Sequence, residues 1–310
     1  MLYCPRFITM KKRVIVKVPA TTANMGPGFD CLGMALDIWN LVYVELGSSS
    51  FDVIGEGGKS LPRGESNLVY ESLRAAFTEA GQSIPKVTVV CRNEIPLGRG
   101  LGSSSAAVVG GLMAGNELCG RQLSQDQLLE LAAKIEGHPD NVAPALLGGC
   151  QIVLREEGQL ITARLPVPQD LRAVLFIPDS PMPTTEAREL LPSEVTRQDA
   201  VYNMGRVAML VRAFCTGDMT HLSLATNDRL HQPARRTIFP AMKNIFHAAL
   251  EAGALGVFLS GAGSSVLALA RDRELTIGYE MADAAAKSGI DGSVKVTKPT
   301  NRGTHVAEDD

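Results

Sequence analysis

The chain has few aromatic residues and no excess of positive charge. Aromatic residues make up 5% of its 310 residues, and 30 Lys and Arg stand against 33 Asp and Glu, for a formal net charge of −3. Proteins that bind nucleic acids usually carry a basic excess, or aromatic side chains on which bases stack. The composition therefore argues against a nucleic-acid partner.

Patterns for disulfides, zinc sites and membrane spans are also missing. The six cysteines are scattered without a CxxC pair, and the five histidines include no HExxH motif. We therefore expect reduced thiols in a cytoplasmic protein. The longest apolar-looking run, residues 253–270, is interrupted by serines and is no membrane span, and residues 1–13 lack the apolar core of a signal peptide. Either Met1 or Met10 can be the natural start.

The remaining composition, 45% hydrophobic and 20% charged, is typical of a globular protein, and the length suggests about two domains. Short β-rich runs predict strands at 14–18, 41–45, 51–54, 87–91 and 256–259, with further strand-like runs between 151 and 177. Helical spacing predicts helices at 67–80, 105–118, 201–214 and 238–252, and one that starts after Ser124 and ends near Gly137. This mixture indicates an α+β fold. Charge and proline increase between 155 and 170, which predicts domains at 1–160 and 161–310.

The most informative segment is a glycine- and serine-rich loop that follows a predicted strand and leads into a helix. Its glycines let the backbone approach a ligand closely, and the free N–H groups at the start of the helix favour an anion. Three consecutive hydroxyls add donors for phosphate oxygens or a ligand for Mg²⁺. We expect the loop to bind nucleotide phosphates, with a purely structural turn as the alternative. It comprises Pro96, Leu97, Gly98, Arg99, Gly100, Leu101, Gly102, Ser103, Ser104, Ser105 and Ala106.

This loop matches neither of the two common phosphate-binding motifs. It lacks the lysine of the P-loop, and Ser103 stands where the dinucleotide fingerprint has its third glycine. Together with residues 18–30 (VPATTANMGPGFD) and 259–265 (LSGAGSS), however, it resembles the GHMP kinase superfamily. The resemblance runs from about residue 13 to 297. It implies ATP as cofactor and a two-domain fold: an amino-terminal, ATP-binding domain with a left-handed β-α-β unit, and a ferredoxin-like carboxy-terminal domain.

Within the superfamily, residues 20–24 (ATTAN), 28–33 (GFDCLG) and 138–144 (HPDNVAP) are most similar to the members that phosphorylate L-homoserine. The resemblance implies transfer of the γ-phosphoryl group of ATP to the side-chain hydroxyl of L-homoserine, in threonine biosynthesis. Two alternatives stay open here: a kinase of this superfamily that acts on another small alcohol, and a non-catalytic ATP-binding sensor. Because the family is often dimeric, a homodimer is one expectation.

The resemblance also assigns nucleotide and metal contacts. Asn67 would border the adenine, and Ser104 and Glu130 would bind Mg²⁺, with Glu136 as the substitute for Glu130. The sequence itself favours another reading of Glu130. It precedes Lys134 by four positions and lies opposite the apolar face of its helix, as in an ordinary solvated ion pair.

For the acceptor, the resemblance implies Asp140 and Asn141 as catalytic residues, in a loop that follows a helix. Either a carboxylate accepts the hydroxyl proton, or the γ-phosphate takes it. Asp30 or Asp140 suits the substrate ammonium, and arginines suit its carboxylate because the guanidinium forms two parallel hydrogen bonds; Arg236 leaves a one-residue ambiguity. The substrate-binding residues are expected to be Asn24, Asp30, His138, Thr184, Arg188, Arg235 and Gly261.

Overall fold

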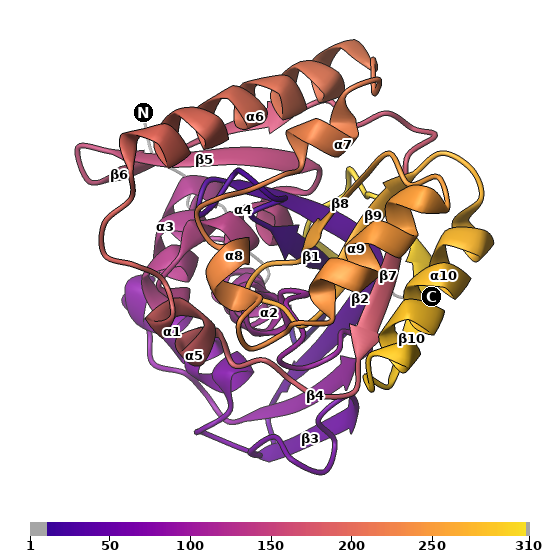
Figure 1. The fold of residues 1–310 in the computed structure, drawn as a ribbon. Helices are drawn as coiled ribbons and strands as arrows, with labels where there is room; N and C mark the ends of the chain where they lie inside the picture. The colour runs from indigo at the N-terminus through magenta and orange to yellow at the C-terminus, as the bar shows by residue number, and fades with distance from the viewer. Residues whose placement is uncertain (1–10, 308–310) are drawn as a thin grey trace.

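The computed structural model describes residues 11–307, so both candidate starts, Met1 and Met10, lie outside the described residues. The chain forms two β-sheets with helices packed against them (Figure 1). The first sheet contains β1 (Arg13–Ala23), β2 (Leu32–Leu46), β3 (Ser50–Gly55), β4 (Val87–Asn93), β5 (Cys150–Glu156), β6 (Gln159–Leu165) and β11 (His305–Val306). The second contains β7 (Arg172–Pro178), β8 (Gly256–Leu259), β9 (Val266–Ala270) and β10 (Gly292–Thr297).

The first sheet is mixed, with β11, β1, β2, β4 and β3 in that order, and β5 beside β2 and β6. In β1, Val14, Val16 and Val18 are buried and alternate with more exposed neighbours, which places one face of the strand on the core. All its pairings are antiparallel except that of β3 with β4, which are joined through the helix α1 (Leu68–Glu79). This unit is the β-α-β arrangement that the resemblance implies, and its left hand stays a prediction.

The helix α2 (Ser103–Leu118) runs through the interior of this first part and is buried along most of its length. Small residues let α1 approach it closely, because a Cβ on Gly111 would lie 2.3 Å from the carbonyl oxygen of Val69. Two further helices, α3 (Gln125–Glu136) and α4 (Pro139–Leu147), pack beside α2. The first turn of α2 is thereby fixed next to the start of α4, where the candidate site lies.

The second sheet is antiparallel and has the order β10-β7-β9-β8. Its connectivity is β-α-β-β-α-β, with α9 (Met242–Glu251) before β8 and α10 (Glu274–Lys287) before β10, which is the ferredoxin-like arrangement. Between β7 and α9 lie α5 (Thr184–Glu189), α6 (Arg197–Thr216), α7 (Leu222–Ala225) and α8 (Gln232–Arg235). Among residues 11–307, no helix combines the length and apolar character that crossing a bilayer requires.

The predicted α+β class with a ferredoxin-like second part is confirmed by this architecture. The sheets change after Leu165, a few residues beyond the predicted division at 160, and β11 returns to pair with β1. The last strand of the chain therefore belongs to the first sheet. The domain limits of 1–160 and 161–310 stay predictions.

Candidate active site

The glycine- and serine-rich loop forms an open cradle at the start of α2. Gly98, Gly100 and Gly102 have φ angles of +63°, +71° and +71°, where a side chain is strained. A Cβ on Gly102 would lie 1.9 Å from Thr21 Oγ1, and one on Gly100 would lie 2.0 Å from the carbonyl oxygen of Ser260. Gly102 stands at the N-cap and offers no side chain to the first amides of α2, which leaves them available for an anion.

Two residues of the predicted nucleotide loop turn their side chains away from the cradle. The Arg99 guanidinium donates hydrogen bonds to the carbonyl oxygens of Pro178 (2.7 Å), Leu97 (2.8 Å) and Asp179, so it ties the loop to the end of β7. The Leu101 side chain is buried in the core. Only the backbone of these two residues can contribute to phosphate binding.

The carboxylate beside the cradle is Glu136, the residue expected only as the substitute for Glu130. Its two oxygens accept hydrogen bonds from the hydroxyls of Ser104 (2.8 Å) and Ser105 (2.9 Å). Glu130 lies elsewhere: it accepts from the backbone N–H of Leu160 (2.5 Å) and pairs with Arg155 at 3.3 Å. The assignment of Glu130 beside Ser104 is therefore wrong in this structure.

The physical reason is the geometry of α3. Glu136 lies six positions after Glu130, so at 100° and 1.5 Å per residue they lie about 9 Å apart along the axis and on different faces. The hydroxyl and carboxylate oxygens at Ser104, Ser105 and Glu136 are hard ligands that fit Mg²⁺. Among the described residues, no group of three or more His, Cys, Asp or Glu side chains could hold a metal ion.

A mostly apolar cavity of about 340 Å³ adjoins the cradle at the start of α1. Leu61, Leu68, Val69 and Leu97 contribute to its walls, which also reach Ser103 and Ser104. Asn67, which is predicted to border the adenine, lines this cavity. Its side chain caps α1 by accepting from the Val69 N–H (2.9 Å) while donating to the Pro62 carbonyl (2.8 Å). The cavity can take the flat, apolar faces of a purine whose phosphates lie on α2.

On the other side of the cradle, residues 138–141 begin a helix and do not form the predicted loop. His138 is the N-cap of α4, and Pro139 takes the first helical position, where proline is favoured. Asp140 follows in the first turn and is buried, with Oδ1 3.8 Å from His138 Nδ1. This oxygen has no hydrogen-bond partner within residues 11–307. Burial, with a smaller contribution from the Asp30 carboxylate, raises the pKa of Asp140 from 3.8 to about 6.

The side chain of Asn141 extends from the first turn of α4 towards the cradle. Its Oδ1 accepts a hydrogen bond from the Thr21 hydroxyl (2.7 Å), and a Cβ on Gly102 would lie 3.3 Å from that same oxygen. Thr21 is a contact that the sequence reasoning missed, although it stands in the first motif. The side chains of α4 therefore lie directly beside the place where phosphates would bind.

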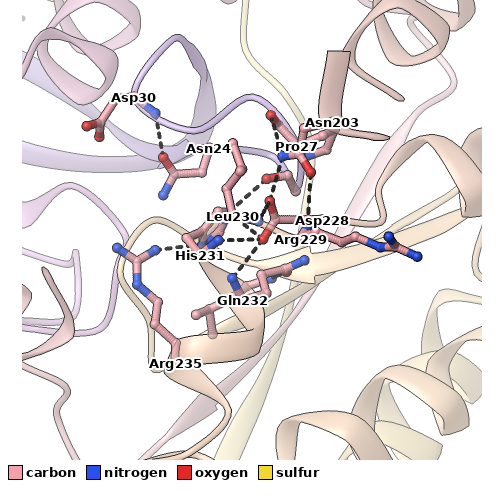
Figure 2. A network of polar contacts seen from close by, with 12 residues as sticks. Asn24, Pro27, Asp30, Asn203, Asp228, Arg229, Leu230, His231, Gln232 and Arg235 are labelled. Atoms are coloured by element: carbon pink, nitrogen blue, oxygen red, sulfur yellow. Dashed lines mark hydrogen bonds and ion pairs between the residues drawn. The ribbon is translucent and has the colours of Figure 1, made fainter. Parts of the chain in front are cut away.

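The first motif also contacts the second glycine-rich turn. Asn24 donates from Nδ2 to the carbonyl oxygen of Gly261 (2.9 Å) and accepts from the backbone N–H of Asp30 (3.0 Å), a contact drawn in Figure 2. Gly261 in turn approaches Gly100 of the cradle. These contacts bring three segments that are distant in the sequence to one pocket.

Two arginines from the second part of the chain complete the pocket. Arg188 donates to both Asp30 oxygens, at 2.7 and 3.1 Å, and Arg235 donates from Nη1 to the Gly261 carbonyl at 3.1 Å. Burial and the nearby Arg188 lower the pKa of Arg235 to about 10, so its guanidinium is charged at neutral pH. Thr184 begins α5, and its side chain lies outside the described residues.

The pocket brings most of the predicted substrate and catalytic residues together. Its volume is about 140 Å³, which suits a small polar molecule. Asp30 lies at the edge of the pocket, where it pairs with Arg188, which lines the pocket. Arg236 is not among the lining residues. The predicted residues that do line it are Asn24, Gly98, Gly100, Gly102, Ser103, Ser104, Ser105, Glu136, His138, Asp140, Asn141, Arg188, Arg235 and Gly261.

Comparison with known proteins gives the class to which this arrangement belongs. The model of the GHMP kinase N-terminal domain matches residues 67–149, and that of the GHMP kinase C-terminal region matches residues 210–285. The mevalonate kinase of L. major shares the fold, with a TM-score of 0.70 at 15% identity over 96% of this chain and 99% of its own. The chain belongs to the GHMP kinases, and its family accordingly uses ATP.

Several curated homoserine kinases match nearly its full length. That of Moorella thermoacetica is 44% identical over 293 residues, which are 94% of this chain and 99% of the relative. That of Carboxydothermus hydrogenoformans is 40% identical over 294 residues, 94% of this chain and 95% of the relative. The crystal structure of homoserine kinase from Cytophaga hutchinsonii has a TM-score of 0.87 at 32% identity, and the match covers 99% of this chain and all of that one.

Proposed function

We propose that this protein transfers the γ-phosphoryl group of ATP to the side-chain hydroxyl of L-homoserine, giving O-phospho-L-homoserine for threonine biosynthesis. The observation that supports this most strongly is the charge pattern of the pocket. It sets Arg188 and Arg235 near Asp30 and Asp140, beside a phosphate cradle. An amino acid carries one carboxylate and one ammonium group, so it matches both pairs of charges. The substrate named for the relatives is such an amino acid.

The acceptor would bind across the pocket. The two arginines suit its carboxylate, and Asp30, which stands at the rim with Arg188, suits its ammonium group. This binding would exchange part of the Asp30–Arg188 ion pair for contacts with the substrate. The hydroxyl would then reach Asp140 and Asn141 at the start of α4, next to the cradle.

The nucleotide would bind with its base in the apolar cavity at α1 and its phosphates on the first amides of α2. Ser104, Ser105 and Glu136 would hold Mg²⁺, whose chemistry is to neutralise charge on the phosphate oxygens. The glycines of the cradle keep side chains out of this space, which allows close approach of the backbone.

During transfer, the bond between the γ-phosphorus and the bridging oxygen of ATP breaks, and a bond from that phosphorus to the hydroxyl oxygen forms. The hydroxyl proton must leave, and we assign it to Asp140. This carboxylate is buried, and one of its oxygens has no hydrogen-bond partner in the described part of the chain. Its pKa of about 6 leaves it ionised yet able to accept a proton near neutral pH. Asn141, anchored through Thr21, would orient the hydroxyl.

The expected surroundings of the enzyme stay predictions. The cysteines at 31, 91, 119, 150 and 215 are free thiols, in keeping with a reducing compartment such as the cytoplasm. A homodimer also stays a prediction.

A steady-state acceptor panel tests the proposal. Purified protein with ATP and Mg²⁺ would be given L-homoserine, L-serine, mevalonate or galactose in separate assays, with product identified by ³¹P NMR. We expect the highest kcat/KM with L-homoserine. A preference for mevalonate or galactose would assign the protein to another acceptor, and nucleotide binding without turnover on any acceptor would identify a sensor.

A further inference from the structure

Arg235 is a fully buried cation, and the hydrogen-bond partners found for it among the described residues are neutral groups. Its side chain is 1% exposed at the end of α8. Within the described residues, it donates hydrogen bonds to the carbonyl oxygens of Ala187 (3.4 Å) and Gly261 (3.1 Å), and to Nδ1 of His231 (2.8 Å). These contacts use Nε and Nη1, and no contact to Nη2 is found in the same part of the chain. The N–H groups of Nη2 are therefore left for a ligand.

The contact with His231 fixes the protonation of the histidine. A guanidinium has only donors, so Nδ1 of His231 must accept with its lone pair. Its Nε2 lies 2.8 Å from the carbonyl oxygen of Gly26, and this nitrogen therefore carries the proton and donates. The ring is consequently the neutral Nε2–H tautomer, in agreement with burial, which lowers the pKa of His231 to about 4.

Other side chains hold His231 in place, as Figure 2 shows. Asp228 Oδ2 accepts from the backbone N–H groups of His231 (2.9 Å) and Gln232 (2.7 Å), and its Oδ1 accepts from Asn203 Nδ2 (2.7 Å). The Phe29 ring stacks on the imidazole with 5.3 Å between the ring centroids, and it also lies 5.7 Å from the Arg235 guanidinium carbon. The histidine is thus held on both its backbone and its ring.

We propose that His231 is a positioning residue for substrate binding. As a neutral hydrogen-bond acceptor, it holds the Arg235 guanidinium so that the free Nη2 edge faces the carboxylate of the amino-acid substrate. The inference rests on the proposed function, in which Arg235 binds that carboxylate. His231 does not line the pocket and acts only through Arg235. Without the hydrogen bond to His231 Nδ1, the Arg235 guanidinium would lose the constraint on its orientation, and the affinity for the amino-acid substrate would fall.

Two variants with side chains of similar shape isolate the effect of the hydrogen-bond acceptor at His231. His231→Asn places an oxygen near the position of Nδ1, whereas His231→Leu has the same branching without an acceptor, and both lose the contact of Nε2 with Gly26. We expect His231→Leu to raise KM for L-homoserine about tenfold or more, because a hydrogen bond to a charged group is lost. KM for ATP should stay within about twofold, and His231→Asn should recover most of the homoserine KM.

Equal homoserine KM values for the two variants would overturn the proposal, as would a wild-type KM in His231→Leu. Arg235→Leu separates this failure from that of the proposed function. If Arg235→Leu raises the homoserine KM and His231→Leu does not, the carboxylate assignment stands and the positioning role is wrong. If neither variant raises it, both are wrong.

A spectroscopic measurement on the unsubstituted protein keeps the test independent of how the variants fold. Long-range ¹H–¹⁵N correlation spectra of the histidine rings distinguish the two neutral tautomers and the imidazolium. For the His231 ring, assigned by its absence from the His231→Asn spectrum or, if that variant does not fold, by specific labelling, we expect Nε2–H with a bare Nδ1 at pH 7. A proton on Nδ1 would overturn the proposal.

Discussion

The most informative perturbation is Asp140→Asn, because the structure predicts opposite effects on activity and on stability. Burial raises the pKa of Asp140 in the folded chain from its ordinary value of 3.8 to about 6. At 1.36 kcal/mol for each pKa unit, the ionised carboxylate costs the folded state roughly 3 kcal/mol above pH 6. An amide of nearly the same shape removes this charge, so the variant should be more stable than the wild type at pH 8 by up to roughly 3 kcal/mol.

The sign of the pH dependence follows from the same shift. Between about pH 4 and pH 6, the folded wild type binds a proton at Asp140 that the unfolded chain does not bind. The wild type therefore gains stability as the pH falls through 6, and the advantage of Asp140→Asn should shrink accordingly. Urea unfolding of both proteins at pH 8 and pH 4.5 measures this difference. A difference that is the same at both pH values would refute the argument that a buried charge causes it.

The activity of the same variant tests proton transfer. If Asp140 accepts the hydroxyl proton, kcat should fall by a factor of about 10² to 10⁴. In the wild type, kcat/KM for L-homoserine should rise with pH through an apparent pKa near 6. Asp30→Asn serves as the control, because that carboxylate is assigned to the ammonium group and its loss should act mainly on KM. A wild-type kcat in Asp140→Asn would show that the γ-phosphate takes the proton instead.

Two further predictions concern the cradle. Glu136→Gln should depress kcat and raise the Mg²⁺ concentration needed for half-maximal activity about tenfold or more, because it weakens a hard-oxygen ligand. Glu130→Gln is the control and should keep both quantities near wild type in the same titration. The reverse pattern would restore Glu130 to the site. Gly102→Ala should raise KM for ATP about tenfold or more and cost more stability than Gly81→Ala, because both alanines take a left-handed φ but only the first meets an atom at 1.9 Å. Calorimetric unfolding and ATP titration of both variants measure this, and equal losses would contradict the steric argument.

The glycine- and serine-rich loop at the start of a helix could be predicted from the sequence because its geometry depends on neighbouring residues. Glycines followed by three serines and a helix have few physical interpretations, and the structure places that loop at the start of α2. The alternation in β1 and the N-cap of α3 at Ser124 depend on neighbouring residues in the same way, and both are confirmed.

The predictions that are wrong concern residues whose position is set by tertiary packing. The helical wheel of α3 could show that Glu130 faces away from the apolar side. It could not show that the Leu160 backbone of β6 donates to Glu130, or that Glu136 reaches the serines of α2. Residues 138–141 are expected in a loop because they follow the helix that ends near Gly137. Pro139 at the first helical position was the signal for α4 that the prediction did not use.

Strand length was the other weak point. A strand was predicted only at 41–45, whereas β2 begins at Leu32 and pairs with β5 before it pairs with β4. Gly33 lies in the part of β2 that was not predicted, and a Cβ there would lie 1.8 Å from the Asp140 carbonyl oxygen. Its role is to let α4 approach the sheet, which the sequence does not reveal. That contact sets the position of Asp140 relative to the cradle.

The central claim is that the first amides of α2 hold the terminal phosphates next to an amino-acid acceptor. A crystal structure with a non-hydrolysable ATP analogue, Mg²⁺ and L-homoserine tests it most directly. We expect the γ-phosphate within hydrogen-bond distance of the backbone at 102–105, the acceptor carboxylate on Arg188 and Arg235, and the hydroxyl between that phosphate and Asp140. A γ-phosphate bound away from this turn, or an acceptor bound in the opposite orientation, would contradict it.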